Sequence, residues 1–123
     1  MPKKIMIVDD DADILVTLRM FFEKNDFEVI AVDSGKDCIK ELQQGFKGVV
    51  LLDITMPFMD GWETLREIIR LGLNKQVMIS VISANTCAKE QSSDVSSYVC
   101  EFISKPFNLE DLIGSVDTKV NNT

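Results

Sequence analysis

Residues 49–61 read VVLLDITMPFMDG, and four apolar residues at the start of this stretch end at the carboxylate of Asp53. Gly48 precedes the apolar run and Pro57 follows it. A short, continuous apolar run with such neighbours indicates a strand that is buried on both faces. Asp53 then lies at the carboxyl end of the strand, which is the edge where open α/β sheets bind their ligands. We therefore expect Asp53 to be the working residue of this protein.

Four more apolar runs of similar length occur along the chain, over residues 4–8, 27–32, 76–82 and 98–104. Segments with apolar residues at helical spacing separate the runs: residues 12–24, Ser34 to Gly45, Asp60 to Gly72, 87–97, and the residues after Asn108. The segment 87–97 is polar and has the weakest periodicity. Short buried strands that alternate with helices five times predict a parallel sheet between two layers of helices.

The length and charge of the chain restrict its class. The 123 residues suit one domain, and we expect residues 1–123 to be that single domain. The 13 basic and 20 acidic residues give a formal charge of -7, which argues against direct binding of nucleic acid. No apolar run approaches the roughly 18 residues of a membrane span, and the N-terminus lacks the apolar region of a signal peptide. A cytoplasmic protein without membrane insertion is expected.

The metal-binding and redox residues are few. The three cysteines, Cys38, Cys87 and Cys100, are odd in number and widely spaced, which fits neither a disulfide framework nor a metal motif. The chain contains no histidine, so it has no imidazole base and no phosphohistidine of its own. A bound metal must therefore have oxygen ligands, which favours a hard cation such as Mg²⁺.

Reactive side chains follow four of the five predicted strands: Asp9 and Asp10, then Asp53, Ser83 and Lys105. All of them converge at one edge if the sheet is parallel. Carboxylates packed together repel one another, so at neutral pH they need a cation or raised pKa values. With a divalent ion and Lys105 nearby, Asp53 can act as a nucleophile towards phosphorus, and an aspartyl phosphate is a known covalent product of such carboxylates. The acids 9–11 alone would also suit a helix N-terminus, but three of them after a buried strand exceed what capping needs.

These residues resemble the receiver domains of two-component response regulators. The resemblance covers essentially the whole chain and depends on four motifs in order: IMIVDDD at 5–11, LLDITMPFMDG at 51–61, VISAN at 81–85 and FISKPF at 102–107. It implies a flavodoxin-like, doubly wound sheet of five strands in the order 2-1-3-4-5, with five helices. The point where the strand order reverses would then lie beside Asp9, Asp10 and Asp53.

The resemblance also implies a role for each matching residue. Asp53 would be the phosphoacceptor, and Mg²⁺ or Mn²⁺ would be held by the side chains of Asp10 and Asp53 and by the backbone carbonyl of Thr55, with Asp9 acting through a metal-bound water. Ser83 would turn towards the phosphoryl group, and Lys105 would pair with it or with Asp53. Phe102 would be an aromatic switch residue, and the Lys105–Pro106 peptide bond would be cis. Thr55 and Asn85 would be positions that tune dephosphorylation.

The leading functional hypothesis is a stand-alone receiver that accepts phosphate from a sensor histidine kinase or a phosphotransfer protein. Its output would be a contact with an unknown protein, made by a monomer or by a weak, phosphorylation-dependent dimer. One alternative is a Mg²⁺-dependent phosphatase of the haloacid-dehalogenase type, but that signature needs an Asp where Thr55 stands. The other alternative is an interaction module that works without phosphate, although such modules commonly lack one of the acids or the lysine.

Overall fold

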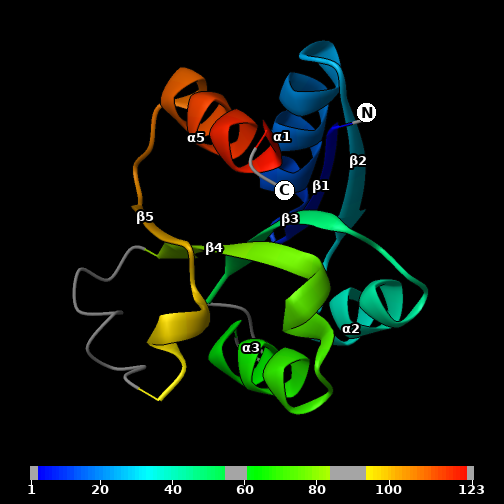
Figure 1. The fold of residues 1–123 in the computed structure, drawn as a ribbon. Helices are drawn as coiled ribbons and strands as arrows, with labels where there is room; N and C mark the ends of the chain where they lie inside the picture. The colour runs from blue at the N-terminus through cyan, green and yellow to red at the C-terminus, as the bar shows by residue number, and fades with distance from the viewer. Residues whose placement is uncertain (1–2, 55–60, 84–93, 122–123) are drawn as a thin grey trace.

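The structure is a computed structural model that describes residues 3–54, 61–83 and 94–121. Five strands form one sheet in the order β2-β1-β3-β4-β5, and every neighbouring pair is parallel (Figure 1). The strands are β1 (Lys3–Val8), β2 (Phe27–Val32), β3 (Gly48–Asp53), β4 (Val77–Ser83) and β5 (Glu101–Ser104). This order confirms the flavodoxin-like sheet that the sequence motifs implied.

Four α-helices lie in the described residues: α1 (Ala12–Lys24), α2 (Gly35–Gln43), α3 (Gly61–Arg70) and α5 (Leu109–Asn121). Two short 3-10 helices accompany them, η1 (Leu73–Gln76) and η2 (Ser96–Tyr98). A further helix was expected between β4 and β5, over residues 87–97, of which 87–93 lie outside the described residues. The described end of that segment contains the start of η2 and no α-helix.

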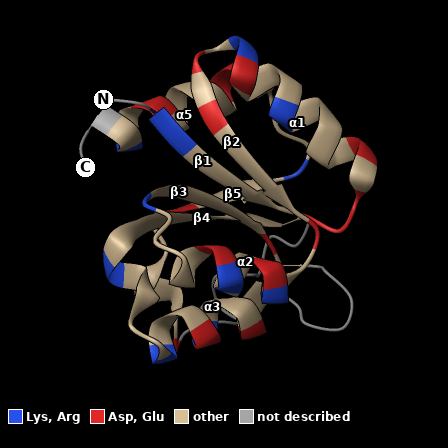
Figure 2. Cartoon of the chain, turned by 90° about the vertical axis from the view of Figure 1, so that its right-hand side faces the viewer, with Lys and Arg blue, Asp and Glu red and all other residues tan. Residues whose placement is uncertain are grey.

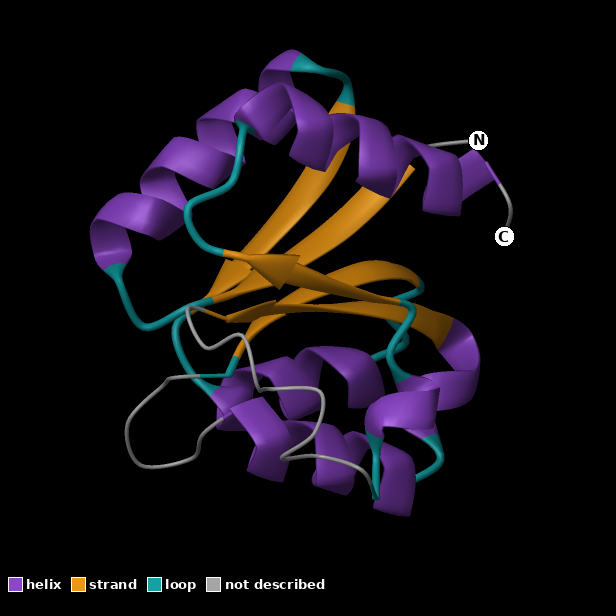
Figure 3. Cartoon of the chain, turned by 90° about the vertical axis from the view of Figure 1, so that its left-hand side faces the viewer, coloured by secondary structure: helices purple, strands orange, loops and turns teal. Residues whose placement is uncertain are grey.

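Helices cover both faces of the sheet, with α1 and α5 on one face and α2 and α3 on the other (Figures 1 and 3). Side chains of successive strand residues point to opposite faces, and β1 shows this clearly. Ile5 and Ile7 are buried in the cluster beneath α1 and α5, while Met6 and Val8 are buried in the cluster beneath α2 and α3. Burial of both faces explains why β1 and β3 read as continuous apolar runs.

Side-chain caps start three of the helices where the sequence predicted them. Oδ1 of Asp11 accepts hydrogen bonds from the backbone N–H groups of Asp13 and Ile14 at 2.9 and 3.3 Å. The hydroxyl of Ser34 accepts from a first-turn N–H of α2, and Oδ1 of Asn108 accepts from two first-turn N–H groups of α5. Such caps satisfy donors that have no partner inside the helix, so these boundaries follow from local chemistry.

The last two strands begin later than the sequence predicted. The N–H groups of Tyr98 and Val99 donate to carbonyls of the preceding turn, so they cannot pair with β4. Pairing with β4 begins at Cys100, whose N–H donates to the carbonyl of Ile79 at 2.7 Å. At the start of β4, Gln76 belongs to η1, and its amide donates to the carbonyls of two residues near the end of α2, Leu42 and Phe46.

Charges of both signs alternate along the outer faces of α2 and α3 (Figure 2).

Within the described residues, no helix is long and apolar enough to cross a membrane. Cys38 is a buried free thiol and Cys100 an exposed one, as expected for cysteines without a shared motif. Cys87 lies outside the described residues.

Candidate functional site

The carboxyl ends of the parallel strands bring the predicted residues to one edge of the sheet. Asp9 directly follows β1, and its N–H extends the pairing with β2 by donating to the carbonyl of Val32 at 3.2 Å. Asp53 and Ser83 are the last residues of β3 and β4. Lys105 directly follows β5, and its N–H donates to the carbonyl of Ser83 at 3.0 Å.

Three carboxylates meet at this edge. One oxygen each from Asp9, Asp10 and Asp53 lies within 4.8 Å of the others. Asp9 and Asp53 are each only 2% exposed, whereas Asp10 is exposed to solvent. An all-oxygen donor set of this spacing suits a hard divalent cation, because Mg²⁺ binds through one or two carboxylates and keeps several waters. The exposed Asp10 leaves one side of the cluster open for such waters.

Burial makes the charge of Asp9 costly. Desolvation is the largest effect and, together with the nearby carboxylate of Asp53, it raises the pKa of Asp9 from 3.8 to about 6. A hydrogen bond from the N–H of Asp11 to Oδ1 of Asp9, 2.9 Å long, works in the opposite direction by favouring the charged form, as does the charge of Lys105. Burial and the neighbouring carboxylate of Asp53 therefore both oppose the charged form of Asp9.

Lys105 supplies the positive charge at this edge. Its Nζ lies 3.5 Å from Oδ2 of Asp53, and the two side chains are 27% and 3% exposed. The distance is longer than a well-formed charge-assisted hydrogen bond, which is typically 2.7–2.9 Å. The ammonium therefore forms a long ion pair with Asp53 and is close enough to neutralise its charge.

The other predicted site residues have different outcomes. Ser83 is buried at 5% exposure at the edge that also carries Asp53, and the Lys105–Pro106 peptide bond is cis, as the motif implied. Phe102 is half-buried on β5 and packs against the cluster beneath α2 and α3. Thr55 and Asn85 lie outside the described residues.

Gly61 is a residue of the site that sequence reasoning took only as the start of a helix. A Cβ atom at this position would lie 2.6 Å from the carbonyl oxygen of Asp53 and would also collide with the backbone of Ile54. The close approach lets the N–H of Gly61 donate to the carbonyl of Ile54 at 3.3 Å. The only signal in the sequence was the Asp60–Gly61 pair, and such pairs also mark ordinary turns.

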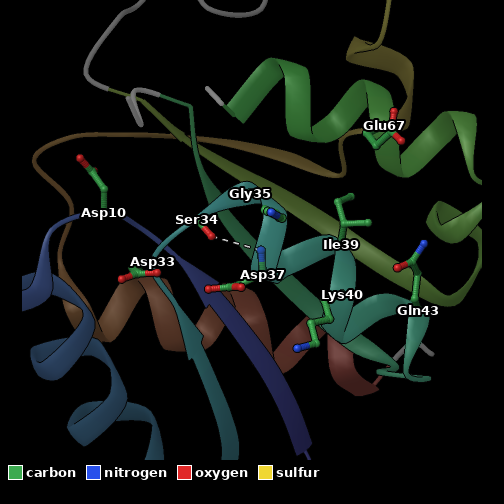
Figure 4. A pocket seen from close by; sticks show the side chains of 10 residues that line it. Asp10, Asp33, Ser34, Gly35, Asp37, Ile39, Lys40, Gln43 and Glu67 are labelled. Atoms are coloured by element: carbon green, nitrogen blue, oxygen red, sulfur yellow. Dashed lines mark hydrogen bonds between the residues drawn. The ribbon is translucent and has the colours of Figure 1, made fainter. Parts of the chain in front are cut away.

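A pocket of about 1010 Å³ opens beside the cluster, between α2 and α3 (Figure 4). Its lining includes Asp10, Ser34 with the first residues of α2, Ile39, and Glu67 on α3. Asp10 is the only member of the acidic cluster among the described lining residues. The acidic cluster, with two buried carboxylates and a lysine, is therefore the candidate site, and the pocket is its neighbour.

The sequence over residues 5–117 matches the response regulator receiver domain family. A CheY-like response regulator receiver domain protein from Methanospirillum hungatei has a solved structure that is similar to this chain, with 39% sequence identity, a TM-score of 0.89 and 98% of each chain covered. The response regulator protein TrrA from Thermotoga maritima, solved in complex with Mg²⁺ and BeF, is 28% identical, with a TM-score of 0.78 over 94% of this chain and 97% of that one.

The transcriptional regulatory protein FlgR of Helicobacter pylori is 34% identical over 114 residues, which are 92% of this chain and 28% of FlgR. The chain spans 28% of the length of FlgR and 53% of that of the response regulator MprA from Mycobacterium sp.. The family match covers most of the 123 residues, and the sheet order and acidic cluster agree with it. The family match favours a phosphoacceptor signalling module over a conventional phosphatase. The chain belongs to the response regulator receiver domain family.

Proposed function

We propose that the chain accepts a phosphoryl group on Asp53 from a phosphohistidine donor, in a reaction that requires Mg²⁺. The observation that carries this proposal is the placement of Asp53 itself. Its carboxylate is nearly buried, shares an edge with Asp9 and Asp10, and has the Nζ of Lys105 at 3.5 Å. A nucleophile between a cation site and an ammonium has the alignment and charge neutralisation that phosphoryl transfer needs.

In the proposed reaction an oxygen of Asp53 forms a P–O bond while the P–N bond of the donor phosphohistidine breaks. The imidazole nitrogen keeps the electron pair of the broken bond. Asp10 and Asp53, with Asp9 acting through a water, would hold a divalent cation, which would supply positive charge for the phosphoryl oxygens. Lys105 supplies a second positive charge beside Asp53, and the Ser83 hydroxyl offers a hydrogen-bond donor from β4. Thr55 is proposed as a backbone ligand of the cation.

The proposed partners follow from this chemistry. A sensor histidine kinase or a phosphotransfer protein is the proposed phosphodonor, because the chain contains no histidine of its own. The formal charge of -7 supports an output through protein contact rather than direct nucleic-acid binding. Work in the cytoplasm and a monomer or a weak phosphorylation-dependent dimer stay predictions. Cell fractionation would test the location, and the assembly state of the purified protein with and without phosphorylation would test the second.

The direct test is incubation with acetyl phosphate, with and without Mg²⁺, followed by intact mass measurement. We expect one added phosphoryl group on the wild type with Mg²⁺ and none on Asp53→Asn. Asp33→Asn is the matched control, because Asp33 is exposed beyond the end of β2 and its replacement makes the same change in charge. Labelling of Asp53→Asn at the wild-type level would refute the proposed role of Asp53.

A further inference from the structure

Helix α3 contacts the segment before β5 at one point and β5 itself at a second. The guanidinium of Arg66 donates two hydrogen bonds to the carboxylate of Asp94, from Nε to Oδ2 at 2.9 Å and from Nη2 to Oδ1 at 3.3 Å. One turn earlier, the ring of Trp62 lies against the ring of Phe102, with centroids 6.3 Å apart and an interplanar angle of 45°. Residues four apart on a helix share one face, so both contacts come from the same side of α3.

The segment 94–102 is anchored to the core between these two points. Val95 is buried in the hydrophobic cluster beneath α2 and α3, and Val99 and Phe102 pack against the same cluster. The hydrogen bonds from Arg66 hold the pKa of Asp94 below its usual value, so the carboxylate is charged and paired at neutral pH. The segment therefore leads from α3 into β5 as a packed element with two attachments.

The two elements joined by these contacts, α3 and β5, both reach the candidate site. Helix α3 begins at Gly61, whose backbone packs directly on the carbonyl of Asp53. Strand β5 leads from Phe102 to Lys105, whose Nζ is 3.5 Å from the Asp53 carboxylate. A phosphoryl group on Asp53 adds bulk and charge between these groups, so the spacing of Lys105 from Asp53 must change. Phe102 lies only three residues before Lys105, which directly follows β5.

We propose that Trp62 and Arg66 form a clamp on residues 94–102 that favours the unphosphorylated arrangement, so that both are positioning residues for the Asp53 site. This proposal rests on the proposed phosphoacceptor function. A contact present in one of two states shifts the equilibrium between them, and by linkage it changes the affinity of any ligand that prefers the other state. Loosening the clamp should therefore tighten binding of a phosphoryl mimic.

The expected effect is moderate because the ion pair is exposed. The side chains of Arg66 and Asp94 are 45% and 58% exposed, and pairs of this kind change an equilibrium by roughly twofold to fivefold. The aromatic contact, which is half-buried, corresponds to about twofold to tenfold. Affinity for beryllofluoride in the presence of Mg²⁺ measures this equilibrium, since beryllofluoride mimics the phosphoryl group on a carboxylate.

The experiment compares beryllofluoride affinities by calorimetry for wild type, Arg66→Asp, Asp94→Arg and the doubly swapped protein. We expect each single variant to bind about twofold to fivefold more tightly and the swapped pair to return to the wild-type value. Arg70→Asp is the matched control, because Arg70 lies on the same helix and pairs with Glu67 of that helix. Its affinity should equal that of the wild type, and urea denaturation of each variant separates folding from coupling.

Trp62 provides a second readout, because it is the only tryptophan of the chain. Its emission should change when beryllofluoride binds to the wild type, and Phe102→Leu should reduce that change. The clamp would be overturned if the single variants bind as the wild type does, if the swap restores nothing, or if emission stays constant during binding. A wild type that fails to bind beryllofluoride with Mg²⁺ would instead overturn the proposed function, and the clamp with it.

Discussion

Replacing Asp9 by asparagine should stabilise the metal-free protein at neutral pH. Burial and the neighbouring Asp53 raise the pKa of Asp9 to about 6 in the folded state. A carboxyl group with a raised folded-state pKa contributes stability that is fully present below its unfolded pKa near 3.8 and is lost as pH rises through about 6. Asparagine cannot acquire that charge, and its side-chain oxygen can still accept the 2.9 Å hydrogen bond from the N–H of Asp11.

The size of the effect follows from the shift in pKa. Raising the pKa of Asp9 from 3.8 to about 6 corresponds to about 3 kcal/mol of unfolding free energy lost between pH 4 and pH 7.5. Urea denaturation of a domain of this size has a slope of about 2 kcal/mol per molar. The urea midpoint of Asp9→Asn should therefore exceed that of the wild type by about 1.5 M at pH 7.5 in a chelator, and by little at pH 4.

Mg²⁺ should reduce this difference in stability. A ligand at a hundredfold excess over its dissociation constant stabilises the folded state by about 2.7 kcal/mol, and the wild type should receive that gain while Asp9→Asn receives less. Asp33→Asn controls for net charge, because it removes an exposed charge. A gain for Asp9→Asn that is equal at pH 4 and pH 7.5, or one that Asp33→Asn reproduces, would refute the argument from buried charge.

Three further predictions concern backbone packing, the ion pair and a buried hydroxyl, and urea denaturation checks each. Gly61→Ala should lower the free energy of unfolding by about 1–3 kcal/mol, because its Cβ would collide with the backbone at Asp53. Gly114→Ala is the control: this exposed helical position has open space around it, so the free energy of unfolding should rise by up to about 1 kcal/mol. Equal effects of the two substitutions would contradict the packing argument. Lys105→Met should cost about 1–3 kcal/mol without metal and less with Mg²⁺, because Asp53 loses its partner; a cost independent of Mg²⁺ would count against this. Ser80→Ala should be neutral or stabilising by about 1 kcal/mol, because the buried hydroxyl has no hydrogen-bond partner within the described residues; a large loss would reveal a hidden partner.

The strands and caps were predictable because their causes are local. A run of residues buried on both faces of a sheet needs consecutive apolar side chains, as in the last four residues of β1 and the middle four of β3. The caps at Asp11, Ser34 and Asn108 depend only on residues two or three positions away. The convergence of Asp9, Asp53 and Lys105 followed from parallel strands alone, while the strand order came from the family resemblance.

The remaining features depend on contacts between distant parts of the chain. Strand β5 starts late because two N–H groups before it donate to carbonyls of the η2 turn instead of pairing with β4. The amino-acid composition of this stretch does not indicate which of the two partners is used. The approach of Gly61 to Asp53 and the pairing of Arg66 with Asp94 likewise join residues through tertiary packing. An exposed arginine on a helix reads as a solvated residue until its partner is placed beside it.

The most direct test of the account is to locate the phosphoryl group itself. Protein labelled with acetyl phosphate and Mg²⁺ is reduced with borohydride, which converts an aspartyl phosphate into homoserine, and the peptides are then mapped by mass spectrometry. The account predicts homoserine at position 53 alone, and only when Mg²⁺ was present during labelling. Homoserine at Asp9 or Asp10, or labelling that proceeds equally in a chelator, would contradict it.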